Sequence, residues 1–195
     1  MGIHDLLKHM KFSTEKCNIT NFDNQTVAVD VSSWIVKASY SCAEQLHAPN
    51  GEDVCAPRYT KSIVNRCIEL LTFAKLEKIV LVFDGERCPL KASTNAERRR
   101  VRAADLQEAY RLKSLGRREE AQDKFRKCTM NTPLMAAHVK RAIKTAFGAK
   151  SKFPDGVVCL QAPYEADSQL VKCVVDGVAD VVITEGKPAT RERAT

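Results

Sequence analysis

The amino-acid sequence predicts an α/β fold in which a parallel β-sheet is flanked by helices. Short runs of β-branched residues alternate with segments whose apolar residues recur at helical spacing. One run, residues 78–84, is apolar almost throughout and ends in Asp-Gly, which is typical of a strand covered on both faces. Strands that alternate with helices are joined by right-handed crossovers, so we expect them to lie parallel in one sheet.

Local patterns predict the individual elements. Strands are expected over residues 26–31, 78–84, 156–162 and 180–184. Helices are expected over residues 33–46, 59–74, 132–148 and 163–176. In the third helix Thr132 is the predicted N-cap, Pro133 suits the first position and Gly148 ends the helix. Residues 186–195 are polar without apolar periodicity, which predicts an unstructured tail.

Composition indicates a folded protein with a polyanionic partner. The chain has 195 residues, of which 44% are hydrophobic, enough for a single domain with a real core. The formal net charge is +7, which favours polyanions without choosing between DNA, RNA and an acidic membrane. Residues 86–127 hold thirteen Lys or Arg against seven Asp or Glu, so this segment carries most of the charge. We interpret it as a separate functional element.

Several classes of function are disfavoured. Eight cysteines occur without any C-x-x-C pair, which argues against a zinc ribbon, and we expect all of them to be buried thiols in a reducing compartment. Neither an apolar signal region nor a stretch of membrane-spanning length is present, which predicts a soluble intracellular protein without membrane partners. Glycine-rich nucleotide-binding motifs do not follow any predicted strand.

Acidic residues stand at the carboxyl end of every predicted strand. Asp30 ends the first strand, Asp84 ends the second, Glu165 and Asp167 follow the third, and Glu185 follows the fourth. Taken singly, each has a structural explanation, as a helix cap, a turn residue or a partner of a helix dipole. In parallel sheets, however, these strand ends meet at one edge, where ligands bind.

Gathered together, these carboxylates predict a metal site. Acidic groups at one edge without basic partners repel one another unless a cation neutralises them. Oxygen ligands without His or Cys favour Mg²⁺ or Mn²⁺ over zinc. Two such ions about 4 Å apart activate water and stabilise the leaving oxygen in phosphodiester hydrolysis. The residues therefore favour a nuclease.

The basic segment supplies a partner for a phosphate. Lys91 and Arg98 are two helical turns apart and share a face, and Arg99, Arg100 and Arg102 add to the cluster. Since the segment directly follows the second strand, its cations can lie over the acidic edge and steer a scissile phosphate towards the metals. A solvated helix face with ion pairs, or a nuclear localisation signal, is the alternative interpretation.

Several motifs, in order along the chain, resemble the structure-specific 5′ nuclease family of flap endonucleases and exonuclease 1, most closely its exonuclease 1 branch. They are Met1-Gly2-Ile3, Val27-Ala28-Val29-Asp30 with Trp34, Val82-Phe83-Asp84-Gly85, Ala162-Pro163-Tyr164-Glu165-Ala166-Asp167 with Gln169-Leu170, and Ile183-Thr184-Glu185. The resemblance implies a PIN-like 5′ nuclease fold with a basic helical arch inserted in it. It implies four segments: residues 1–85 and 131–185 as two parts of the nuclease domain, 86–130 as the arch, and 186–195 as a divergent tail.

The resemblance also implies roles for individual residues. The metal-site carboxylates would be Asp30, Asp84, Glu165 and Asp167, holding two Mg²⁺ ions, with Mn²⁺ as a possible substitute. Lys91 and Arg98 match the basic pair at the base of the arch that contacts the scissile phosphate. Gly2 matches the N-terminal residue near the active site, and Arg99 and Arg102 would add contacts to DNA.

The implied activity is 5′ to 3′ DNA exonuclease or 5′ flap endonuclease. The implied partners are DNA with 5′ ends, nicks or flaps, and mismatch-repair or replication factors in the nucleus. The chain departs from the family at Gly186 and Pro188, where relatives carry two more metal carboxylates, and at Val36, where relatives place a His or Tyr that stacks on a base. We therefore expect weak, salt-sensitive DNA binding with impaired cleavage. Two alternatives are a non-catalytic DNA-binding or regulatory fragment of such a nuclease, and a nuclease that acts on RNA.

Overall fold

A four-stranded parallel sheet lies at the centre of the protein. The computed structural model describes residues 15–86 and 89–184. The strands are β1 (Thr26–Asp30), β2 (Lys78–Phe83), β3 (Val157–Gln161) and β4 (Val181–Ile183), in the order β3-β2-β1-β4. All three strand pairs are parallel. The predicted α/β fold class is therefore confirmed.

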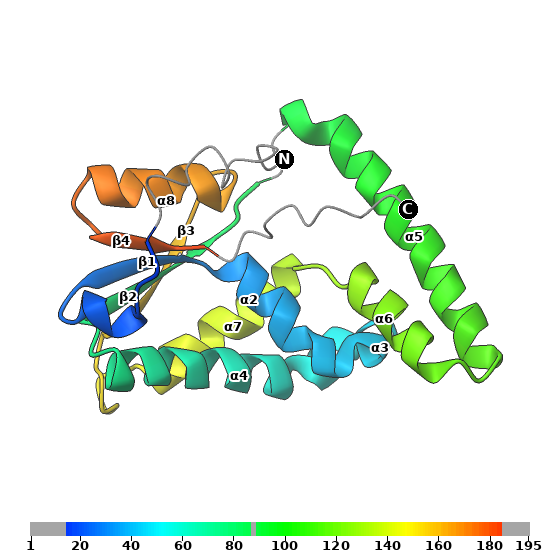
Figure 1. Cartoon of the computed structure of the whole chain (residues 1–195), viewed down its shortest axis with the longest axis horizontal. Helices are drawn as coiled ribbons and strands as arrows, with labels where there is room; N and C mark the ends of the chain where they lie inside the picture. The colour runs from blue at the N-terminus through cyan, green and yellow to red at the C-terminus, as the bar shows by residue number, and fades with distance from the viewer. Residues whose placement is uncertain (1–14, 87–88, 185–195) are drawn as a thin grey trace.

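Helices cover both faces of this sheet. In Figure 1, α8 lies on one face, while α2, α4 and α7 lie on the other. The α-helices are α2 (Val31–Ala38), α3 (Ala43–Leu46), α4 (Gly51–Phe73), α5 (Ala92–Ser114), α6 (Arg118–Cys128), α7 (Pro133–Ala146) and α8 (Ala166–Val175). Short 3-10 helices are η2 (Ile19–Phe22), η3 (Ser39–Cys42) and η4 (Pro89–Lys91). Within the described ranges, none of the helices combines the length and apolar character that a bilayer crossing requires.

The two faces of the sheet pack against separate hydrophobic clusters. Side chains alternate along a strand, so Val27 and Val29 of β1 join the larger cluster with α2, α4 and α7, while Ala28 joins the smaller one with α8. All of β2 except its first residue is buried, as the continuous apolar run predicts. The sheet is thus covered on both sides and leaves its carboxyl edge to hold the polar side chains.

Two predicted helix boundaries are wrong for identifiable reasons. The helix expected over 33–46 is interrupted by η3, where the buried Ser39 hydroxyl donates to the Ile35 carbonyl oxygen at 2.7 Å and competes with the regular helix. The helix expected over 59–74 begins earlier, at Gly51, because Cys55 continues its buried stripe.

The last predicted helix also begins later than expected. The helix α8 starts at Ala166 rather than at Pro163, because the main-chain oxygens of Pro163 and Tyr164 accept bonds from the turn after β2. Helix α7, in contrast, is capped as predicted, since the Thr132 hydroxyl accepts from the main-chain N–H of Met135.

The prediction for the cysteines is partly wrong. Cys17 and Cys159 are exposed, the latter because β3 is an edge strand. Buried free thiols are found at Cys42, Cys55, Cys67, Cys128 and Cys173. Cys88 lies outside the described residues.

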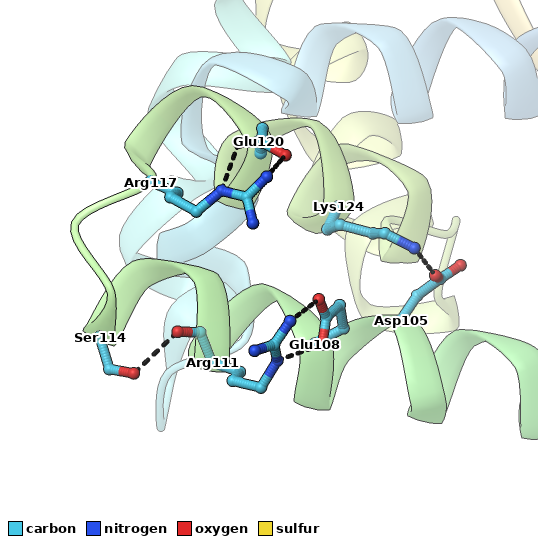
Figure 2. A network of polar contacts seen from close by, with 7 residues as sticks. All are labelled: Asp105, Glu108, Arg111, Ser114, Arg117, Glu120 and Lys124. Carbon is cyan, nitrogen blue, oxygen red and sulfur yellow. Dashed lines mark hydrogen bonds and ion pairs between the residues drawn. The ribbon is translucent and has the colours of Figure 1, made fainter.

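The basic segment forms a helical hairpin of α5 and α6. Its apolar interior is small and consists of Ala109, Leu112, Ala121 and Phe125, packed with Ala43 of α3. Figure 2 shows the ion pairs of the hairpin: Lys124 of α6 bonds to Asp105 of α5 at 2.5 Å, Arg111 bonds to Glu108 within α5, and Arg117, the N-cap of α6, bonds to Glu120. Residues of both α5 and α6 attach the hairpin to α3, and α5 extends beyond the body (Figure 1).

Candidate active site

One pocket of about 720 Å³ gathers the candidate residues that the structure describes, with the exception of Arg100. Its lining includes four carboxylates from the carboxyl edge of the sheet and four cations from the start of the basic segment: Asp30, Asp84, Glu165, Asp167, Lys91, Arg98, Arg99 and Arg102. Gly2, Glu185, Gly186 and Pro188 lie outside the described residues. Residues that are distant in the sequence are thus brought to one place by the parallel topology.

Asp30 occupies the junction between β1 and α2. Its carboxylate accepts a bond from the main-chain N–H of Ser32 at 2.9 Å, so it is the N-cap of α2. Burial raises the pKa of Asp30, against that hydrogen bond, and the negative charges of Asp84 and Asp167 raise the pKa further. Asp30 therefore caps α2 and at the same time lies close to two other acids.

Asp84 follows β2 and is held through both of its side-chain oxygens. Ser32 of α2 donates its hydroxyl to Oδ2 at 2.6 Å, and the main-chain N–H of Ala166 donates to Oδ1 at 2.9 Å. The second bond places a negative charge at the N-terminus of α8, which the helix dipole favours. Gly85 follows, and a side chain there would collide with the main chain of Ala162 and Pro163. The glycine of the Asp-Gly pair thus allows the chain after β2 to pass close to the chain after β3.

The expectation that the acids at this edge have no basic partners is wrong for Glu165. Its carboxylate forms an ion pair with the ammonium of Lys91, which lies at the end of η4. Both side chains remain partly exposed, at 42% and 35%, so the pair contributes little stability by itself. Lys91 therefore reaches the acidic edge, as the sequence predicted, but it does so by contacting one of the acids.

Asp167 lies two residues further on, in the first turn of α8, and is exposed. As the side chains stand, the described part of the chain contains no group of three or more His, Cys, Asp or Glu arranged to hold a metal ion. The donor set nevertheless consists of carboxylate oxygens, which suit hard divalent cations. Of the two Glu165 carboxylate oxygens, Oε2 is the one that contacts Lys91.

The wall opposite the carboxylates is formed by α5. Asn95, Arg98, Arg99 and Arg102 line the pocket from this helix. Arg100 does not line it, because its guanidinium makes a two-pronged ion pair with Glu97 on the outer surface. For Arg100 the alternative interpretation, a solvated helix face with ion pairs, is therefore correct.

Three further pocket side chains were not singled out by the sequence. Lys140 of α7 donates to the side chain of Gln161, and its ammonium lies 4.7 Å from the centre of the Phe83 ring. Asn131 lies between α6 and α7 and donates to Ser32 at 3.2 Å. Lys140 follows the pocket residue Ala136 by four positions, a helical spacing that could have indicated that both lie on the same face of α7. No sequence signal marks Asn131.

Comparison with known proteins identifies the family. Residues 1–105 match the model of the XPG N-terminal domain, which is more than half of the chain. The chain belongs to the XPG N-terminal domain family. This agrees with the resemblance of the sequence to 5′ nucleases.

Curated relatives carry exonuclease names. The chain is 38% identical over 189 residues to exonuclease 1 of Danio rerio. It is 32% identical over 185 residues to exodeoxyribonuclease 1 of Saccharomyces cerevisiae. Both matches cover 95% of the present chain. It spans 21% and 24% of these two relatives. The match therefore concerns one portion of much longer proteins.

Solved structures share the fold. The catalytic core of Rad2 in complex with DNA substrate superposes with a TM-score of 0.57 at 21% identity, covering 94% of this chain and 46% of that one. Human GEN1 in complex with Holliday junction DNA gives a TM-score of 0.54 at 15% identity, covering 96% and 37%. The α/β architecture is thus shared with these two DNA-bound proteins.

Proposed function

We propose that this chain carries the N-terminal part of a metal-dependent nuclease that hydrolyses phosphodiester bonds in DNA, as a 5′ to 3′ exonuclease or 5′ flap endonuclease. The observation that carries the proposal is the shared pocket, in which carboxylates from the ends of β1 and β2 and the start of α8 face the cations of α5. Family membership and the names of the relatives support the same activity.

In this proposal Asp30, Asp84, Glu165 and Asp167 hold Mg²⁺, with two ions in the complete site and Mn²⁺ as a substitute. Bound divalent ions would supply an activated water and charge stabilisation for the leaving oxygen. The raised pKa of Asp30 supports this assignment, because burial and, to a lesser extent, the charges of Asp84 and Asp167 disfavour its ionised form, which a bound cation would stabilise.

The cations of the pocket would bind the substrate. Lys91 and Arg98 are assigned to the scissile phosphate, and Arg99 and Arg102 to neighbouring phosphates. Lys91 is well placed for this role, since a metal ion that binds Glu165 would release its ammonium towards the phosphate. Gly2 completes the proposed DNA contacts.

The proposal extends to the cellular setting. DNA with 5′ ends, nicks or flaps is the proposed partner, together with mismatch-repair or replication factors in the nucleus. Residues 1–85 and 131–185 are proposed as the nuclease domain, 86–130 as the arch and 186–195 as a divergent tail.

A second candidate is a non-catalytic DNA-binding or regulatory fragment. Gly186 and Pro188 favour it, because neither side chain offers a ligand where the family is expected to carry carboxylates. Losing part of the metal site should affect chemistry more than binding, since charge stabilisation in the transition state amounts to several kcal/mol. Both candidates therefore predict salt-sensitive DNA binding, and they differ in cleavage.

A cleavage assay with end-labelled 5′-flap DNA separates the two. The nuclease proposal predicts slow cutting in Mn²⁺ or Mg²⁺ that Asp84→Asn abolishes, that Asp176→Asn on the far end of α8 leaves unchanged, and that the double change Gly186→Asp, Pro188→Asp accelerates. Binding without metal-dependent cutting in all four proteins would favour the second candidate. An RNA flap competitor that displaced the DNA preferentially would contradict the choice of DNA as substrate.

A further inference from the structure

A chain of two hydrogen bonds leads from Asn131 through Ser32 to Asp84. The Asn131 amide donates to Ser32 Oγ at 3.2 Å, and Ser32 Oγ donates to Asp84 Oδ2 at 2.6 Å. These residues come from the segment before α7, the first turn of α2 and the end of β2. Three distant parts of the sequence therefore meet behind one carboxylate.

The direction of these bonds is fixed by their chemistry. A serine hydroxyl has one proton, and the Asp84 carboxylate can only accept, so the Ser32 oxygen is left to accept from Asn131. With the main-chain N–H of Ala166 on Oδ1, each oxygen of Asp84 receives one donor. Asp84 and Asn131 both line the pocket, so a ligand there can reach the Asp84 carboxylate.

Helix stability does not explain this arrangement. The N-terminus of α2 is capped by Asp30 through the main-chain N–H of Ser32, so the Ser32 hydroxyl is not needed for the cap. Asn131 also keeps its Oδ1 buried without a hydrogen-bond partner in the described part of the protein, which costs free energy. The Ser32 hydroxyl and the Asn131 amide group are therefore available for a role at the site.

We propose that Ser32 and Asn131 are positioning residues that orient Asp84 for a divalent cation. This inference rests on the proposed function, because it assumes that Asp84 is a metal ligand. Ligating carboxylates are commonly held by a second layer of hydrogen bonds, and removing such a partner typically weakens metal binding about 10- to 100-fold. Ser32 acts through Asp84, and Asn131 acts through Ser32.

The test measures Mn²⁺ affinity of the full chain by calorimetry, with electron paramagnetic resonance of free Mn²⁺ as a second readout. Ser32→Ala is expected to weaken binding about 10-fold, and Ser32→Thr, which keeps the hydroxyl, should restore most of it. Ser33→Ala is the matched control, since the Ser33 hydroxyl donates to the Asp30 main-chain oxygen on the same helix turn. It should bind Mn²⁺ as the unchanged chain does.

Asn131→Ala provides an independent variant if Ser32→Ala does not fold. It should also weaken Mn²⁺ binding, and the double variant should bind no more weakly than Ser32→Ala alone, because both changes break one chain of bonds. If Asp84→Asn loses Mn²⁺ while Ser32→Ala and Asn131→Ala keep full affinity, the positioning role is overturned and the metal site stands. If the unchanged chain binds no Mn²⁺, both the inference and the proposed metal site are overturned.

Discussion

The ring of His47 stacks against the ring of Phe125, with 6.0 Å between their centres and 28° between their planes. His47 is the C-cap of α3 in the body, and Phe125 belongs to α6 in the helical hairpin. An ion pair of 2.6 Å between Lys113 and Glu44 joins the same two parts. The orientation of α5, and so of its arginines over the pocket, depends on this junction.

Phe125→Ala should detach the hairpin from the body. Phe125 is completely buried, and removing such a ring from a packed cluster costs about 3–5 kcal/mol. Urea denaturation should show this loss, and DNA affinity should fall with it. Leu115→Ala is the control, since Leu115 is 59% exposed, and its effect should stay within about 0.5 kcal/mol. A stable Phe125→Ala variant with unchanged DNA affinity would contradict the dependence.

The same junction should weaken in acid. Burial lowers the pKa of His47 from 6.5, partly offset by its hydrogen bond to the Phe125 main chain. In the window below pH 6.5 the unfolded chain therefore binds more protons than the folded chain, so stability falls as pH falls. Unfolding free energies between pH 8 and pH 5 should decline more steeply for the unchanged protein than for His47→Phe. Parallel curves would exclude His47 as a source of the dependence.

Tyr59→Phe should loosen the packing of α4 on α7. The buried Tyr59 hydroxyl lies 2.6 Å from His138 Nδ1 and donates to the Glu52 main-chain oxygen at 3.2 Å. Losing it removes the hydrogen-bond partner of His138 Nδ1, at a cost of about 1–3 kcal/mol. Thermal denaturation should reveal the loss. Tyr110 is 45% exposed, and the Tyr110→Phe variant should melt at the same temperature as the unchanged protein. Equal effects of the two changes would refute the assignment.

Gly85→Ala should displace Asp84 from the pocket. A methyl group at Gly85 overlaps the main chain of Ala162 and Pro163, so the two segments must separate, at a cost of about 3 kcal/mol or more. Gly116→Ala is an informative comparison. A methyl group at Gly116 would have open space around it, so the only strain comes from holding an alanine at a φ of +76°. It should cost about 1 kcal/mol. Chemical denaturation measures both, and the reverse ranking would be incompatible with the close approach.

Arg99 and Arg100 offer a matched pair for the DNA interface. Arg99 lines the pocket, whereas Arg100 pairs with Glu97 outside it. If Arg99 contacts a phosphate, Arg99→Gln should weaken DNA binding and reduce the slope of log affinity against log salt by about 1. Arg100→Gln removes the same formal charge and should change the slope less. Fluorescence anisotropy at several salt concentrations measures the slopes, and identical slopes for the two variants would reject the pocket as the interface.

Local sequence signals predicted much of the fold. The β-branched run before Asp30 and the apolar run before Asp84 are the central strands β1 and β2, because buried parallel strands carry apolar residues on both faces. The gathering of acids followed from topology, since parallel strands end at one edge. The Thr132 cap followed from hydrogen-bond chemistry that is local in the chain.

Features that depend on distant contacts were missed. The ion pair between Lys91 and Glu165 joins residues 74 positions apart, and no local pattern contains it. The late start of α8 depends on bonds from the turn at Gly85, again across the molecule. Asn131 lies in a short connection whose composition says nothing about its neighbour Ser32. Such contacts are selected by the assembled fold rather than by residue preferences.

The position of β4 has a consequence for the order in which the chain folds. Its alignment depends on Asp180, which accepts from the main-chain N–H of Thr26 at 2.8 Å and returns a main-chain bond to the same residue, 154 positions earlier. Contacts so far apart close large loops and form slowly, whereas α5 and α6 follow one another in the chain and can pair over a short sequence separation. During synthesis on the ribosome the hairpin can assemble early, whereas β4 pairs with β1 only after residues 181–183 have been added.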